Sequence, residues 1–121
     1  TTISAGTLQT TGTLGNTDIS ISSGATYDVD ATDTIGSIGG AGAINIATSQ
    51  TLTTSTSSNT TVSGVISGAG TLEKAGTGTL TLTGSNDYTG GTSFAGGTVS
   101  LGSANAISTS GTLSFSGGAI Q

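Results

Sequence analysis

The stretch that decides the fold spans residues 71–91 and reads TLEKAGTGTLTLTGSNDYTGG. In its centre, Leu80 and Leu82 alternate with threonines, so the leucines lie on one side of an extended chain and the threonines on the other. A period of two with β-branched residues on the polar side predicts a β-strand. The turn-forming residues that follow, GSNDYTGG, predict a bend after that strand.

The same alternation recurs along the chain. It places apolar residues two apart at Ile19 and Ile21, Tyr27 and Val29, Ile44 and Ile46, Val99 and Leu101, and Leu113 and Phe115. Helices are not expected, because 27 threonines, 22 glycines and 19 serines make up more than half of the 121 residues and form helices poorly. The predicted fold class is therefore all-β.

A short token joins these strands: a glycine, a small residue, and an apolar residue that opens the next strand. It occurs at 6–8, 12–14, 42–44, 70–72, 78–80, 97–99 and 111–113, with a longer relative at 24–27. The interval from Gly6 to Gly24 equals that from Gly24 to Gly42, and the interval from Gly78 to Gly97 is nearly the same, whereas other spacings are irregular. Short strands at a period of about 20 residues predict a β-solenoid.

A solenoid also accounts for the few apolar residues, because its interior is narrow. We expect residues 1–121 to form one β-solenoid segment of about six coils, roughly 30 Å long at ~4.8 Å per coil. The least apolar stretch is residues 48–61, which offers only Leu52 for burial. It is expected to form a protruding loop or a polar wall of a coil.

Residues 68–107 resemble the passenger-associated repeat of bacterial autotransporter proteins. The residues that match the repeat are Gly68, Gly70, Leu72, Lys74, Gly76, Gly78, Thr79, Leu80, Leu82, Gly84, Asn86, Tyr88, Gly90, Gly91, Thr92, Phe94, Gly97 and Thr98. Val99 stands in place of the usual leucine, and Asp87 and Ser93 in place of common threonines. The resemblance implies a single-stranded right-handed parallel β-helix that belongs to a long secreted or surface-anchored protein, and it marks a scaffold rather than an activity.

Within this repeat each kind of residue has an expected place. The interior is expected to hold Leu72, Leu80, Leu82, Phe94, Val99 and Leu101. Corners that need positive φ or close backbone approach are expected at Gly76, Gly78, Gly84, Gly90, Gly91 and Gly97.

The polar and aromatic residues of the repeat complete these expectations. Asn86 and Asp87 should cap nearby backbone amides, and Tyr88 should pack its ring on the coil wall. Glu73 and Lys74 are adjacent in one strand and so point to opposite faces. Lys74 is expected to point outward or, alternatively, to reach a carboxylate of a neighbouring coil.

The one acidic cluster is Asp28, Asp30 and Asp33. Asp28 and Asp30 would face the same way, and oxygen atoms on one face are a candidate Ca²⁺ site. The alternative interpretation is a solvated turn, and no other cofactor is expected. The chain has no histidine or cysteine, and its single basic side chain is Lys74, so we expect no enzymatic activity.

Charge and hydropathy argue against two kinds of binding partner, nucleic acid and the membrane interior. One lysine against six acidic residues argues against nucleic acid. No apolar run approaches the roughly 18 residues of a membrane-spanning helix, and no leader pattern opens the sequence. We therefore expect no membrane insertion of this segment, and the sequence identifies neither a receptor nor a carbohydrate.

Three functions remain open. The first is a stalk segment of an extracellular or cell-surface adhesin passenger. The second is a self-assembling filament or biofilm-matrix subunit that associates through its solenoid ends, because no cap pattern is present at residues 1–3 or 117–121. The third is an ice-binding-type array of threonines, such as Thr79, Thr81 and Thr83, but irregular spacing does not repeat one pair on successive coils.

Overall fold

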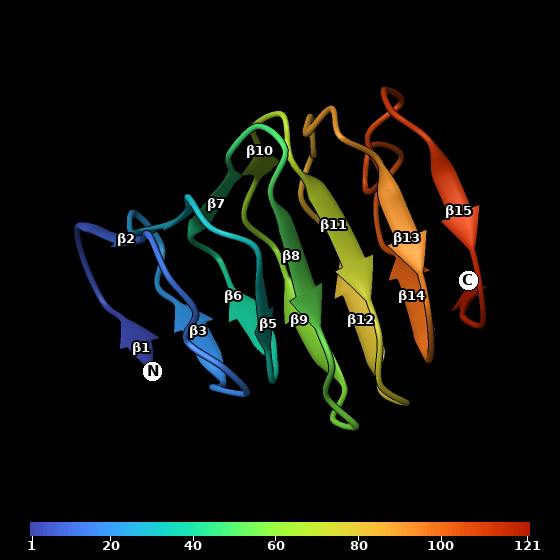
Figure 1. Cartoon of the computed structure of the whole chain (residues 1–121), viewed down its shortest axis with the longest axis horizontal. Helices are drawn as coiled ribbons and strands as arrows, with labels where there is room; N and C mark the ends of the chain where they lie inside the picture. Colours follow the sequence, from blue (N-terminus) through green and yellow to red (C-terminus); the bar gives the residue numbers. More distant parts are fainter.

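The computed structural model describes residues 1–121 and consists of sixteen short β-strands without a helix (Figure 1). All strand pairs are parallel, and they form three sheets of seven, four and five strands. Since nothing is helical, no helix of the kind that spans a membrane is present. The predicted all-β class is confirmed.

The strands divide among the sheets as follows. The seven-stranded sheet contains β1 (Thr2–Ile3), β3 (Ile19–Ile21), β6 (Ile38–Gly40), β9 (Thr60–Val62), β12 (Thr79–Leu82), β14 (Thr98–Leu101) and β16 (Ala119–Ile120). The four-stranded sheet contains β2 (Thr7–Thr10), β4 (Thr26–Val29), β7 (Ala43–Ile46) and β10 (Ile66–Ser67). The five-stranded sheet contains β5 (Asp33–Ile35), β8 (Thr51–Thr54), β11 (Thr71–Lys74), β13 (Thr92–Phe94) and β15 (Leu113–Phe115).

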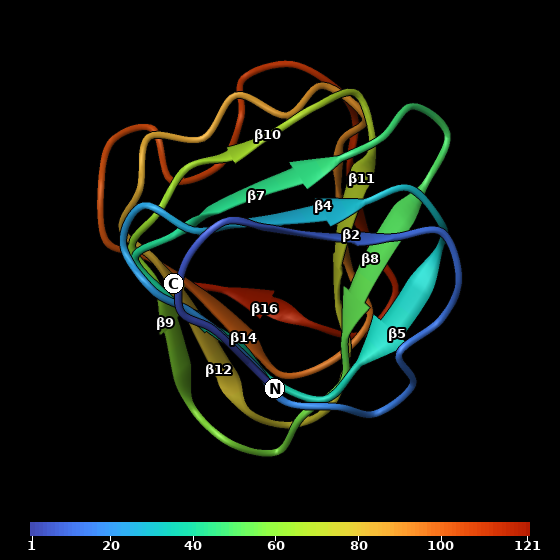
Figure 2. The same cartoon turned by 90° about the vertical axis from the view of Figure 1, so that its left-hand side faces the viewer.

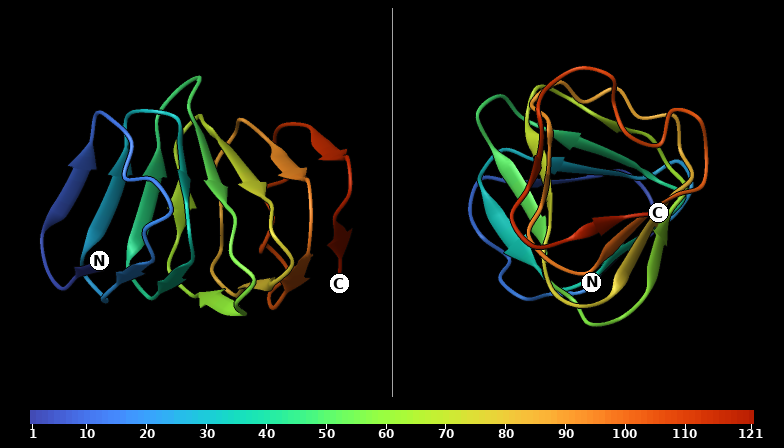
Figure 3. Two further views of the ribbon diagram at one scale, coloured as in Figure 1. Left: turned by 60° about the horizontal axis from the view of Figure 1, so that its bottom comes forward. Right: turned by 90° about the vertical axis from the view of Figure 1, so that its right-hand side faces the viewer.

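The chain visits the three sheets in turn and winds into a β-solenoid. Figure 2 views the N-terminal end, and the chain turns clockwise as it recedes, so the winding is right-handed as predicted. The three sheets enclose a roughly triangular cross-section, and the termini lie at opposite ends of the long axis (Figure 3). Six coils begin at β1, β3, β6, β9, β12 and β14, which agrees with the predicted number.

The coils differ in length although the strands stay in register. On the seven-stranded sheet, Thr2 pairs with Ser20, Gly40 with Val62, and Thr79 with Thr98. Of these three pairs, Gly40 and Val62 lie farthest apart in sequence. The loops absorb these differences. A degenerate spacing in sequence is therefore compatible with a continuous ladder of backbone hydrogen bonds.

Inward-facing residues stack in columns along the axis. One column of the four-stranded sheet runs through Leu8, Tyr27, Ile44 and Ile66. One column of the five-stranded sheet runs through Ile35, Thr54, Lys74, Phe94 and Phe115. Twenty buried hydrophobic residues form one core cluster. Of the six predicted interior residues, five are buried, and Leu101 is 39% exposed because it faces the open end of the last coils.

The polar stretch 48–61 forms a wall rather than a protruding loop at its centre. β8 pairs with β5 on one side and β11 on the other. Leu52 is buried, and so is Thr54, whose hydroxyl donates a 2.9 Å hydrogen bond to the carbonyl of Gly36. A threonine can occupy the interior here because its one polar atom finds a backbone acceptor.

The six predicted glycine corners are confirmed, for two different reasons. Gly76, Gly91 and Gly97 have positive φ. At Gly78, Gly84 and Gly90 a Cβ atom would lie within 2.4 Å of backbone atoms of the preceding coil. Gly76 and Gly97 meet both conditions, since a Cβ at either would also lie 2.4 Å from a carbonyl oxygen of the preceding coil.

Candidate functional site

The four-stranded sheet ends at β10, and beyond it this face of the solenoid is built from loops 83–91 and 102–112. In the first loop, Asn86 and Tyr88 are buried while Ser85 and Asp87 are exposed, so the chain keeps the alternation of a strand without its ladder. The backbone groups of three coils must find other hydrogen-bonding partners here.

Asn86 supplies several of those partners. Its Oδ1 atom accepts a 2.8 Å hydrogen bond from the amide of Ile66, one coil earlier. Its Nδ2 atom donates a 2.6 Å hydrogen bond to the carbonyl of Ala106, one coil later. Its own amide donates to the carbonyl of Asn105 at 2.8 Å. Asn86 therefore joins three coils at the point where the sheet stops.

The prediction that Asn86 and Asp87 cap nearby backbone amides is right for Asn86 and wrong for Asp87. The amide that Asn86 caps, that of Ile66, belongs to the preceding coil. The Asp87 carboxylate forms no hydrogen bond within the chain, and only its amide is bonded, to the carbonyl of Ile66 at 3.0 Å. Local turn chemistry does not describe a position whose neighbours belong to other coils.

Tyr88 lies inside the solenoid, not on the coil wall. Its side chain is fully buried, and its hydroxyl is hydrogen-bonded to the Thr92 hydroxyl. Burial raises the pKa of the Tyr88 phenol above its ordinary value. The alternation with Asn86 was the available sequence signal for this inward position.

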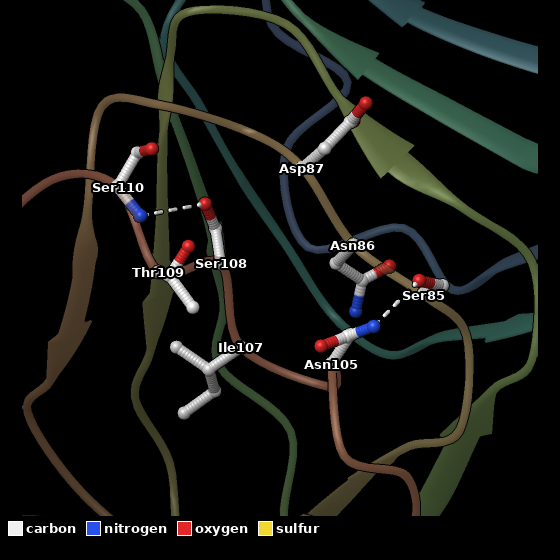
Figure 4. A pocket seen from close by; sticks show the side chains of 8 residues that line it. All are labelled: Ser85, Asn86, Asp87, Asn105, Ile107, Ser108, Thr109 and Ser110. Carbon is white, nitrogen blue, oxygen red and sulfur yellow. Dashed lines mark hydrogen bonds between the residues drawn. The ribbon is translucent and has the colours of Figure 1, made fainter.

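A hollow of about 250 Å³ opens between the two loops (Figure 4). Its lining consists of one apolar and seven polar residues: Ser85, Asn86, Asp87, Asn105, Ile107, Ser108, Thr109 and Ser110. In Figure 4, residues 85–87 line one side and residues 107–110 the other. We refer to these eight residues as the inter-loop hollow. Sequence reasoning did not find it, because it depends on how the loops of two successive coils diverge.

Lys74 contradicts both sequence expectations. Its side chain is 1% exposed and points into the interior, and it is paired with no carboxylate. The ammonium group donates to the carbonyls of Ala75 and Gly76, the latter at 3.4 Å. Burial lowers the pKa of this ammonium group. Glu73 points to the other face, as predicted from the strand geometry.

The three candidate calcium ligands are not gathered at one place. Asp28 accepts a 2.7 Å hydrogen bond from Asn45, and Asp30 a 2.5 Å hydrogen bond from Gln9. Asp33 points inward and is 2% exposed; it accepts from the Leu14 amide at 2.7 Å, while its other oxygen is buried without a partner. No three acidic, histidine or cysteine side chains meet in a cluster that could hold a metal ion.

Comparison with known protein families gives a match in the segment that resembles a repeat. Residues 72–101 match the family model described as the passenger-associated-transport-repeat. Neither the curated proteins nor the solved structures gave a match. The matched segment runs from β11 through β14 and includes Lys74, Asn86 and Tyr88, the three inward side chains described above. The resemblance inferred from the sequence is thereby confirmed: residues 72–101 are similar to the passenger-associated-transport-repeat.

Proposed function

We propose that this chain is a stalk segment of an adhesin-type autotransporter passenger, secreted or displayed at a bacterial surface. The observation that carries the proposal is the parallel ladder of the seven-stranded sheet, which runs through every coil from β1 to β16. Backbone hydrogen bonds along the axis join each coil to the next, which makes a stiff spacer. The repeat at residues 72–101 supports a passenger as the parent protein.

The surface chemistry also supports a spacer. Inward positions hold the apolar residues, whereas outward positions of the strands are mostly threonine and serine. The net charge of −5 discourages aggregation of a displayed rod. The proposal assigns a mechanical role to this segment and no catalysis.

Surface display tests the proposal. The chain is placed between an N-terminal affinity tag and an outer-membrane translocator, and whole cells are treated with protease. We expect the tag to reach the surface and the segment to resist cleavage. The matched control is Leu80→Asp, because Leu80 is 1% exposed and a carboxylate there disrupts the interior. Equal cleavage of the native and control segments would refute a folded stalk.

A filament subunit is the second candidate, and one observation favours it. The last coils expose Leu113, Phe115 and Ile120 by 46%, 52% and 42%. The ring of Phe115 stacks on that of Phe94 at 4.6 Å, so the exposed face continues the apolar interior. Light scattering over a concentration series tests this candidate. Association that Phe115→Ser abolishes would support it, and a monomer at every concentration would exclude it.

A further inference from the structure

The inter-loop hollow lies where the backbone ladder between the fifth and sixth coils opens. The ladder is intact at one side of it, where the Asn86 amide donates to Asn105, and at the other, where the Thr92 amide donates to Thr112. Between these points no backbone hydrogen bond joins residues 107–111 to residues 87–90. Main-chain polar groups of both loops are thus left beside a solvent-accessible space.

Side chains add hydrogen-bonding groups that the fold does not use. The Asp87 carboxylate and the Thr109 hydroxyl have no hydrogen-bonding partner in the chain. The Ser85 hydroxyl accepts only a long 3.4 Å contact from Asn105. The hollow therefore offers acceptors and hydroxyl groups that both donate and accept. Ile107 is its one apolar surface.

This set of groups discriminates among classes of ligand. Anions are disfavoured because the hollow has a carboxylate and no basic side chain, in a chain of net charge −5. A calcium ion takes six to eight oxygen ligands, commonly from several carboxylates, whereas Asp87 is the only carboxylate here. An apolar ligand would meet one apolar residue among eight. A neutral, hydroxyl-rich molecule matches all three constraints.

The volume of the hollow also limits the size of the ligand. The volume of about 250 Å³ lies below the range of roughly 300–1,000 Å³ that is typical of sites for drug-sized ligands. We propose that the inter-loop hollow binds one sugar ring of a neutral saccharide. The hydroxyl groups of the ring bond to Asp87, Thr109 and Ser85, and one C–H face of the ring packs on Ile107. This inference goes beyond the proposed stalk function and is independent of it.

A titration followed by NMR tests the inference on the intact chain. Glucose, galactose, mannose and N-acetylglucosamine are added separately to ¹⁵N-labelled protein. We expect at least one sugar to shift the amide signals of residues 85–87 and 105–110 with millimolar affinity, and to leave the other coils unaffected. No shift with any of the four sugars, or shifts elsewhere in the chain, would overturn the proposal.

Two variants test whether Asp87 and Thr109 contact the sugar. Asp87→Ala and Thr109→Val remove groups that hold nothing in the fold, so both should remain folded. We expect each to weaken binding about tenfold, which corresponds to about 1.4 kcal/mol. Glu73→Ala is the matched control, since it removes an acidic side chain on the five-stranded sheet, outside the hollow. Unchanged binding in both hollow variants would overturn the proposal, as would calcium chloride producing the same shifts without sugar.

Discussion

The replacement Asn86→Ala tests whether one side chain takes the place of a sheet. It removes the acceptor of the Ile66 amide and the donor to the Ala106 carbonyl. Ile66 is 1% exposed and Ala106 is fully buried, so water does not reach these backbone groups freely. The variant thus leaves two buried polar groups unsatisfied in two different coils.

The magnitude follows from those two groups. An unsatisfied buried donor or acceptor costs about 1–3 kcal/mol. Two of them give a loss of about 2–6 kcal/mol in the free energy of unfolding, and we expect about 3 kcal/mol because some water can enter from the adjacent hollow. A domain of ordinary stability has about 5–15 kcal/mol in total, so the loss is large.

Two measurements check this expectation. Urea unfolding followed by circular dichroism gives the change in the free energy of unfolding. Hydrogen exchange should show faster exchange at the amide of Ile66, with the far coils unchanged. Asn105→Ala is the control: Asn105 is exposed, and its side chain makes one 3.4 Å contact to Ser85, so its effect should stay within about 0.5 kcal/mol.

The reasoning fails if Asn86→Ala and Asn105→Ala change stability by the same small amount. It also fails if the Ile66 amide remains protected in the Asn86 variant. Either result would mean that the coils are held at this face by packing of neighbouring residues such as Tyr88, and that the hydrogen bonds of Asn86 add little.

Three further predictions concern the interior. Lys74→Ala should lower stability by about 3 kcal/mol, because the carbonyls of Ala75 and Gly76 lose their donor and a cavity forms. Methylammonium chloride should restore more of the lost stability than sodium chloride at equal ionic strength, and equal effects of the two salts would count against a stabilising role of these hydrogen bonds. Burial raises the pKa of the Tyr88 phenol, so the folded state holds the phenolic proton to higher pH than the unfolded state does. The stability that this contributes is fully present below pH 10.0 and is lost as the pH rises further. Urea unfolding measured across that range should show a shallower fall in Tyr88→Phe. Leu82 and Leu101 are register partners, but Leu82 is fully buried and Leu101 is 39% exposed. Leu82→Ala should therefore lower the free energy of unfolding in urea by about 3 kcal/mol and Leu101→Ala by about 1 kcal/mol. Equal losses would contradict the weaker burial of Leu101 in the last coils.

Much of the fold could be predicted because a strand's pattern is local. Alternation in TLTLT fixes which side of β12 is inward, whatever the rest of the chain does. The glycine corners were predicted from the repeat at residues 68–107, where glycines stand between the strand patterns. Leu101 was predicted inside from its alternation, and its direction is right, but its exposure depends on whether another coil covers it.

Lys74 shows where a general rule misled the prediction. It lies two positions after Leu72 in β11, so the alternation alone assigns it to the interior. The expectation that a charged side chain avoids the interior outweighed that pattern. The structure reconciles the two, because corner carbonyls close to the end of β11 accept the ammonium protons. Such acceptors come from the bend after the strand and have no signature in the alternation.

The site near Asn86 could not be predicted for a different reason. Its partners, Ile66 and Ala106, lie 20 residues before it and 20 residues after it, which matches the predicted coil period of about 20 residues. The period locates these neighbours, but it does not show that the four-stranded sheet stops at β10 and leaves their backbone groups to the Asn86 side chain.

Regular and irregular parts of this solenoid place different demands on the sequence. Where a ladder continues, as from β9 through β12 to β14, main-chain groups satisfy one another and a side chain needs only the right polarity and size. Where the four-stranded sheet stops, the main chain no longer does so, and a particular amide side chain with both a donor and an acceptor is required. The same interruption leaves unused polar groups around the inter-loop hollow. Chemical specificity in this chain is therefore concentrated where the four-stranded sheet stops, beside Asn86 and away from the threonine-covered strands.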